Sequence, residues 1–163
     1  MERDAILSPC GRHRYLLTRR WAAGPTAIFI MLNPSTADAL ADDPTIRRCI
    51  GFARREGCGG LAVVNLYSLR ATDPAMLARD PYPHGPEAPR HTTAALRDAD
   101  GPVICAWGAD PMAISESRGM LDLIRATGRR PMCLGVTKGG APKHPSRLRR
   151  DTPLVPFQEP SDV

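Results

Sequence analysis

The chain has 163 residues, a formal net charge of +5 and five cysteines. This length suits a single compact domain with a hydrophobic core, and no apolar run approaches the length that crosses a bilayer. The charged start, Met1 to Asp4, is followed by no signal-type apolar segment, so we expect a cytoplasmic protein with no membrane partner. The cysteines are odd in number and form no C-x-x-C pair, which argues against a disulfide scaffold and against a zinc site.

The first predicted element is a short N-terminal β-hairpin. Its strand Arg-Tyr-Leu-Leu, residues 14–17, follows a turn at Pro9-Cys10-Gly11. A second turn is expected at Gly24-Pro25, where the hairpin ends.

An alternation of apolar runs and helical segments follows. The runs are short enough for strands and apolar enough to be buried on both faces; they cover residues 27–32, 61–64, 103–107 and 132–134. A helix is predicted from Asp43-Pro44, an N-cap acid followed by proline, to Gly57. Further helices are predicted at residues 90–98 and 111–126, and the proline-rich stretch 80–86 is expected to form a surface loop.

Strands that alternate with helices predict a parallel sheet covered on both faces. We therefore expect an α/β protein: a three-layer α/β/α sandwich with a central, mostly parallel four-stranded sheet, plus the short N-terminal β-hairpin. Residues 1–157 are expected to form one domain and residues 158–163 a flexible tail.

The segment 123–150 contains no Asp or Glu. Its positive charges are Arg125, Arg129, Arg130, Lys138, Lys143, Arg147, Arg149 and Arg150. Such a block can attract a polyanion, of which nucleic acid is the commonest in a cytoplasm, or it can be a solvated surface. Charge alone leaves both interpretations open.

Polar residues follow each predicted parallel strand. Asn33-Pro34, Asn65 and Trp107-Gly108 end the first three strands, and the fourth leads into a basic loop that contains His144. Because ligands of open parallel sheets bind beyond the carboxyl ends of the strands, we expect these residues to form one site. Each also has a structural interpretation: a turn cap, a strand-end hydrogen bond, core packing or a solvated imidazole.

Three segments resemble, in order, motifs of the uracil-DNA glycosylase superfamily. They are MLNPS (residues 31–35), VVNLYSLRATDP (63–74) and KHPSRL (143–148), and the likeness covers roughly residues 27–150. The pattern, including RYLLTRRW at residues 14–21, also resembles an uncharacterised bacterial family known only as a domain of unknown function. The resemblance implies a uracil-DNA glycosylase-like fold.

The resemblance also implies roles for individual residues. Asn33 would position the attacking water, Asn65 would bind the edge of the base, and His144 would donate a hydrogen bond to a carbonyl of the leaving base. A wedge that fills the gap left by a flipped base would be Leu148 or Arg147. The residues that would hold phosphates are Ser35, Ser146, Lys138 and Lys143.

The chain departs from the superfamily pattern at several positions. An asparagine cannot act as a general base, so Asp38 is a further catalytic candidate. No aromatic residue closely follows Asn33, so Trp107 or Tyr67 would have to stack on the base. Leu69 occupies the position of an iron–sulfur ligand in some branches, and we expect no cluster, no metal and no other cofactor.

The leading hypothesis is a hydrolase that cleaves the N-glycosidic bond of a modified or damaged base in DNA. One alternative is a nucleic-acid-binding module without catalysis, and another is a hydrolase of free nucleosides or nucleotides. We expect DNA rather than RNA as the partner, and a monomeric protein.

Overall fold

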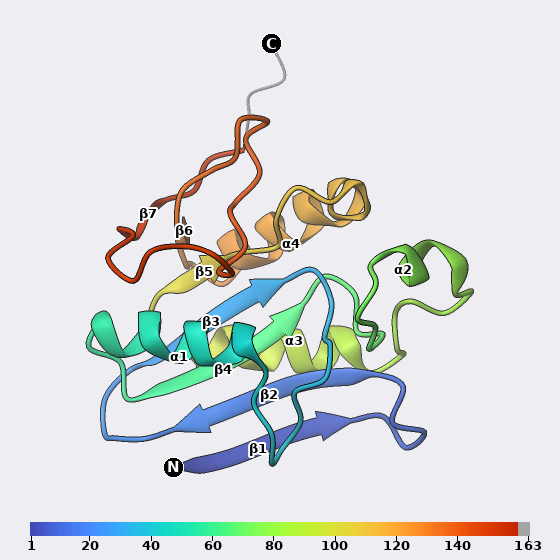
Figure 1. Cartoon of the computed structure of the whole chain (residues 1–163), viewed down its shortest axis with the longest axis horizontal. Coiled ribbons are helices and arrows are strands. Elements are labelled where there is room, and N and C mark those ends of the chain that lie inside the picture. The colour runs from blue at the N-terminus through green and yellow to red at the C-terminus, as the bar shows by residue number, and fades with distance from the viewer. Residues whose placement is uncertain (160–163) are drawn as a thin grey trace.

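The computed structural model describes residues 1–159, and its centre is a mixed seven-stranded sheet with the order β1-β2-β4-β3-β5-β6-β7 (Figure 1). Strands β3, β4, β5 and β6 run parallel, while β1, β2 and β7 pair antiparallel with their neighbours. The strands are β1 Glu2–Leu7, β2 Arg14–Arg20, β3 Thr26–Met31, β4 Gly60–Asn65, β5 Val103–Cys105, β6 Pro131–Cys133 and β7 Val155–Pro156.

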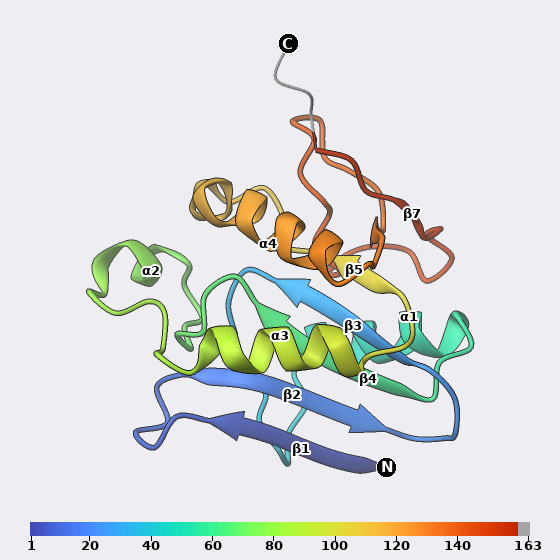
Figure 2. The same cartoon turned by 180° about the vertical axis from the view of Figure 1, so that it is seen from behind.

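Helices cover both faces of the sheet, which gives three layers. Helix α1 lies over one face (Figure 1), where its Ile46 and Cys49 pack with Phe29 of β3. Helices α3 and α4 lie over the other face, as the reverse view shows (Figure 2). Leu96 of α3 and Leu121 of α4 belong to the same core cluster as Ile28 of β3. The helices are α1 Pro44–Arg55, α2 Ala75–Arg79, α3 Ala88–Asp98 and α4 Ile114–Ala126, with a 3-10 turn at Pro111–Ala113.

The α/β class is confirmed, and the four predicted strands form the parallel centre of the sheet. The prediction of a four-stranded sheet is wrong, because the sheet extends at both edges. The N-terminal hairpin is not a separate element: β2 pairs antiparallel with β4, with Leu17 opposite Val63. At the other edge Cys133 of β6 lies opposite Val155 of β7.

The predicted start of α1 is confirmed. The Asp43 carboxylate accepts a hydrogen bond from the amide of Ile46 at 2.9 Å, and Pro44 occupies the first turn, where a missing N–H costs nothing. Beyond the helix Gly57 has a φ of +78°, a left-handed conformation that glycine adopts freely. These local signals fix where α1 begins, and therefore where the Asp43 carboxylate lies.

The order of the parallel strands creates a topological switch point. From β3 the chain passes through α1 on one face to β4, whereas from β5 it passes through α4 on the other face to β6, on the opposite side of the sheet order. The connections therefore leave the carboxyl ends of β3 and β5 in opposite directions, and a ligand can bind between them.

Within residues 1–159, no helix combines the length and apolarity needed to span a bilayer. Residues 160–163 of the expected flexible tail lie outside the described residues.

Candidate functional site

The loop after β6 brings His144 to the switch point between β3 and β5. The amide of Gly108, which follows β5, donates a hydrogen bond to the carbonyl of Pro142 at 2.9 Å. A Cβ placed on Gly108 would lie 3.6 Å from the Cβ of His144, and Gly108 has a φ of +78°. Glycine therefore lets the chain turn at the end of β5, directly beneath the imidazole.

Ser146 fixes the tautomer of the neutral His144 ring. Its backbone amide donates to Nδ1 of His144 at 3.2 Å, and its Oγ lies 2.7 Å from the same atom. Because a backbone N–H can only donate, Nδ1 is the acceptor and the ring proton of the neutral imidazole is on Nε2. Burial lowers the pKa of His144, while the Asp43 carboxylate acts in the opposite direction. At neutral pH the ring is a neutral donor through Nε2.

The amide nitrogen of Asn33 joins two loops at the carboxyl edge of the sheet. Its Nδ2 donates to the carbonyls of Pro34 at 3.1 Å and Ala71 at 2.9 Å, and it lies 3.5 Å from the carbonyl of Leu69. Its Oδ1 makes no hydrogen bond within the described residues, and this oxygen is not buried. The nitrogen thus has a structural role, and the oxygen remains open to solvent.

The amide of Asn65 has the opposite arrangement. Its Oδ1 faces Nη2 of Arg14 at 3.5 Å, and its Nδ2 is buried without a partner among the described residues. Since a guanidinium has only donors, the oxygen must be the atom that faces Arg14. The atom of Asn65 that can still bind a ligand is therefore a donor. It is shielded from solvent, so a ligand reaches it only when a covering group moves.

Arg14, which was not among the predicted site residues, lies beneath this site with 3% of its surface exposed. It donates through Nη1 to the carbonyl of Ala37 at 3.1 Å, and its Nε has no partner within the described residues. Burial lowers the pKa of Arg14 to about 10, partly offset by Asp43. Asp43 is the N-cap residue of α1, and its carboxylate opposes the lowering of the pKa of both Arg14 and His144.

Asp38 and Ser35 lie in the loop between β3 and α1, which is fixed by arginines. The buried Arg19 contacts the Asp42 carboxylate at 2.8 Å and also donates to the carbonyl of Asp38. Arg70 donates to the carbonyl of Ser35 at 3.4 Å. The Asp38 carboxylate accepts the amides of Leu40 and Ala41, both at 2.9 Å, and these bonds lower its pKa. Asp38 thus closes its own turn, and Asp43 is the carboxylate that acts on His144.

Tyr67 and Trp107 are buried in the core on the α3 and α4 face. The Tyr67 hydroxyl donates to the carbonyl of Met112 at 2.7 Å, and its ring stacks on His84 with 4.7 Å between centroids. Trp107 makes an edge contact with Phe157 at 5.8 Å. Both side chains are buried and have a packing role, and neither ring pairs with the His144 ring among the aromatic contacts of the described residues.

The remaining predicted residues belong to the loop after β6. Lys138, Lys143, Ser146 and Arg147 are exposed. Leu148 is partly buried against the core beside α1, and its carbonyl accepts a hydrogen bond from Arg48. Because Leu148 is engaged in packing, Arg147 is the exposed member of the predicted wedge pair.

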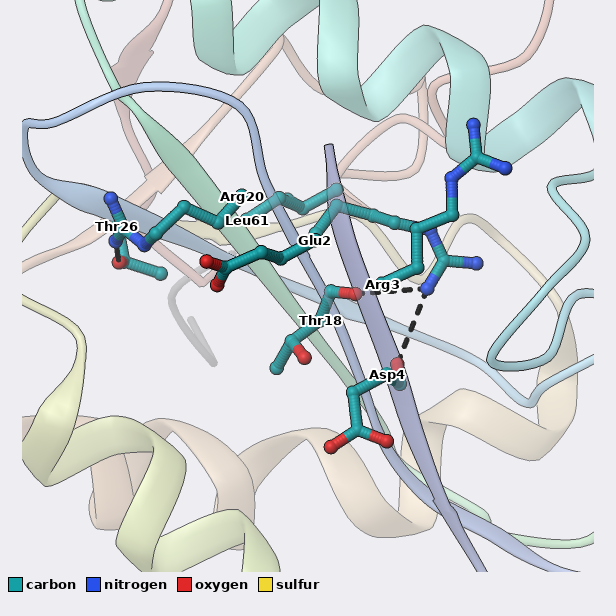
Figure 3. Close-up of a pocket in the computed structure, with 8 residues that line it drawn as sticks. Glu2, Arg3, Asp4, Thr18, Arg20, Thr26 and Leu61 are labelled. Atoms are coloured by element: carbon teal, nitrogen blue, oxygen red, sulfur yellow. Dashed lines mark hydrogen bonds between the residues drawn. The ribbon is translucent and has the colours of Figure 1, made fainter.

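Two cavities are described, and neither is lined by Asn33 or His144. The first, of about 430 Å³, lies over β1 and β2, where Figure 3 shows Glu2 and Asp4 beside Thr18 and Arg20. The second, of about 390 Å³, lies between α3 and α4 and includes Asn65 in its wall.

The described residues contain no group of three or more His, Cys, Asp or Glu side chains that could hold a metal ion. The five cysteines are free thiols. Cys49, Cys58, Cys105 and Cys133 are buried, and burial raises the pKa of each of these four thiols. These thiols pack as small apolar side chains.

Comparison with known families gives one match. Residues 14–146 match the family described as "Protein of unknown function (DUF1643)". The chain belongs to the DUF1643 family. The matched segment of this DUF1643 protein runs from Arg14 to Ser146 and so contains Asn33, Asn65 and His144. The resemblance to a domain of unknown function is thereby confirmed, while no curated protein and no solved structure matches the chain.

Proposed function

We propose that this DUF1643 protein is an N-glycosylase that hydrolyses the bond between a modified base and deoxyribose in DNA. The observation that carries the proposal is His144, a neutral imidazole whose Nδ1 accepts from Ser146 and whose Nε2–H is free to donate at the switch point. The order of the three motifs resembling the uracil-DNA glycosylase superfamily supports the same assignment.

The chemistry follows from the charges that develop. As the C1′–N bond breaks, its electron pair goes to the base and positive charge develops on the sugar. Nε2–H of His144 donates to a carbonyl oxygen of the departing base and stabilises its negative charge. A water held by Oδ1 of Asn33 attacks C1′, and its proton is transferred to the base, which leaves a hydroxyl on the sugar.

The hydrogen-bonding groups favour one class of base. The ring nitrogen of His144 and the amide nitrogen of Asn65 both offer donors, because Nδ1 and Oδ1 are already occupied by Ser146 and Arg14. A base with carbonyl oxygens satisfies two donors, whereas an exocyclic amino group opposes them. An amino group in place of a carbonyl leaves a buried donor of the protein unpaired, and this cost discriminates strongly against amino bases. We therefore assign an oxo base, not an amino base, as the substrate.

One observation favours the alternative of binding without catalysis. The nearby carboxylates are engaged: Asp38 accepts two amides, Asp42 pairs with Arg19 and Asp43 caps α1. Activation of water would therefore depend on orientation by Asn33, and we expect slow turnover. The third possibility, a hydrolase of free nucleosides, predicts that a nucleoside raises the melting temperature of the protein.

The test is an incubation of the purified protein with duplex oligonucleotides that differ only in one base. Each pair contrasts an oxo base with its amino counterpart, uracil with cytosine and hypoxanthine with adenine. Alkali-labile sites are expected only at the oxo base, and they should disappear in His144→Ala and Asn33→Ala. His91→Ala, which removes an imidazole on α3 that lines neither cavity, is the matched control. Absence of abasic sites with every modified base would overturn the proposal.

A further inference from the structure

Helix α1 presents an unusual charge distribution. It carries four arginines, Arg47, Arg48, Arg54 and Arg55, and no acidic residue. Its apolar side faces the sheet through residues such as Ile46 and Phe52, so the arginines lie toward solvent. Within the helix no carboxylate offsets their charge.

The loop that follows His144 adds three more arginines to the same surface. Arg55 donates through Nη1 to the carbonyl of Arg150 at 2.9 Å and also to the carbonyl of Thr152. Arg48 likewise donates to the carbonyl of Leu148. Because backbone carbonyls make these contacts, the side chains of Arg147, Arg149 and Arg150 remain exposed. Segments about one hundred positions apart thus form one surface, the α1 basic surface, made of these seven arginines.

Most of this charge has no ionic partner. Arg55 pairs with Glu56 at 3.1 Å and Arg149 pairs with Asp151 at 3.1 Å. Arg47, Arg54, Arg147 and Arg150 form no ion pair with a carboxylate within the part of the chain that the structure describes. Arg54 lies over the Trp21 ring, 5.2 Å from its centroid, so its charge is held at the surface by a cation–π contact.

Arg147 has a left-handed backbone conformation, which residues with a side chain rarely adopt. Arg147 has a φ of +65°, and it is the only non-glycine residue with a positive φ among the described residues. The conformation is held by a hydrogen bond from the amide of Leu148 to the carbonyl of Pro145 at 3.4 Å. Glycine would adopt it without cost, so an arginine there retains strain, and such strain concentrates where a side chain has a function.

We propose that the α1 basic surface binds the phosphate backbone of duplex DNA. The duplex would lie along α1, with the N-terminal end of the helix, where Arg48 contacts the carbonyl of Leu148 in the loop after His144, nearest the base. From Arg47 to Arg55 the helix rises about 12 Å, which corresponds to about three to four phosphates of one strand. The inference rests on the proposed function for the choice of DNA as the polyanion, but it does not require catalysis.

The test measures the affinity for an unmodified fluorescent 20-base-pair duplex at several salt concentrations, so glycosylase activity is not needed. Arg147→Gly is the decisive variant, because it removes one charge while relieving the strained backbone. Its melting temperature should be unchanged or higher. The affinity at 0.1 M salt should fall by about tenfold, because each phosphate contact contributes about 0.9 to the slope of log affinity against log salt concentration. The double variant Arg54→Glu/Arg150→Glu should bind more weakly still.

The matched control is Arg97→Glu, an exposed arginine on α3, the helix on the opposite face. It should bind the duplex as tightly as the unaltered protein. Equal affinity of Arg147→Gly, the double variant and the control would overturn the inference, as would tighter binding of single-stranded RNA of the same length than of the duplex. If the variants weaken binding but no abasic sites form, the surface stands and the proposed catalysis fails. If abasic sites form and the variants bind normally, only the surface assignment fails.

Discussion

The backbone amide of Ser146 donates to Nδ1 of His144 over 3.2 Å, and this contact determines which nitrogen of the imidazole carries the proton. The contact comes from the backbone, so it does not depend on the serine side chain. A ring with its proton on Nε2 can donate to a substrate, whereas the other tautomer could only accept.

The first prediction concerns this tautomer. Ser146→Ala keeps the backbone donor and should retain the Nε2–H form, with activity within about threefold of the unaltered protein. His144→Ala removes the donor to the leaving base and should lower the rate by about 10²–10³. Nitrogen-15 correlation spectra of the ring report the tautomer directly. A protonated Nδ1 in the unaltered protein at pH 7.5 would contradict the assignment.

The second prediction is a pH profile. Burial lowers the pKa of His144 below its ordinary value of 6.5, so the neutral form persists below that pH. The rate constant kcat/KM should therefore stay level as the pH falls to 6.5. It should decrease only as the pH passes through the lowered pKa, because protonation of Nδ1 breaks the contact with the Ser146 amide that orients the ring. Steady-state kinetics between pH 4.5 and 8 measures this decrease in kcat/KM. A decrease already complete above pH 6.5 would show a raised pKa.

The same shift predicts how stability changes with pH. Between the lowered pKa of folded His144 and the unfolded value of 6.5, the unfolded chain binds more protons. The contribution of His144 to the free energy of unfolding is therefore complete above pH 6.5 and is lost as the pH falls through this interval. Urea unfolding of the unaltered protein and of His144→Gln should differ in slope against pH in this interval. Parallel curves would exclude the contribution.

The third prediction contrasts two isosteric substitutions. Asn33→Asp replaces a nitrogen that donates to the carbonyls of Pro34 and Ala71, so it should lower the free energy of unfolding by about 1–3 kcal/mol. Asn65→Asp instead places a carboxylate against the buried Arg14 guanidinium, which has no carboxylate in hydrogen-bond contact, and should raise the free energy by about 1 kcal/mol. Chemical denaturation of both variants measures these two changes in the free energy of unfolding. Equal effects of the two substitutions would refute the assigned amide orientations.

The fourth prediction concerns the loop between β3 and α1. Arg19 is fully buried and contacts the Asp42 carboxylate and the carbonyls of Asp38 and Ala41. Arg19→Ala leaves these acceptors without their donor and should destabilise the protein by about 3–5 kcal/mol. Hydrogen exchange of residues 38–42 should accelerate.

The control for this substitution lies on the same strand. Arg20 donates to the carbonyl of Ala22 and to Thr26, away from the loop, so Arg20→Ala should leave the exchange of residues 38–42 unchanged. If both variants accelerate exchange in the loop equally, Arg19 does not fix it specifically.

Local features of the sequence predicted the centre of the fold. The apolar runs at residues 27–32 and 61–64 correspond to β3 and β4, because a strand buried on both faces must be apolar at every position. The Asp43-Pro44 pair predicted the start of α1, because capping depends on neighbouring residues only. The N-terminal hairpin was predicted, but the bounds of its first strand β1 were not: the sequence of β1 begins Glu-Arg-Asp, and at an edge the backbone pairs with little side-chain burial.

The environment of the site required the three-dimensional arrangement. Asn33, Asn65 and His144 could be selected because each follows a predicted strand. No local pattern indicated that Arg14 contacts Asn65 or that Asp43 acts on His144. Nor could it show that Tyr67 and Trp107 turn into the core. Hydrophobic periodicity and capping act over a few residues, whereas burial and charge interactions depend on distances between segments far apart in the chain. Those distances exist only once the sheet and its helices have packed.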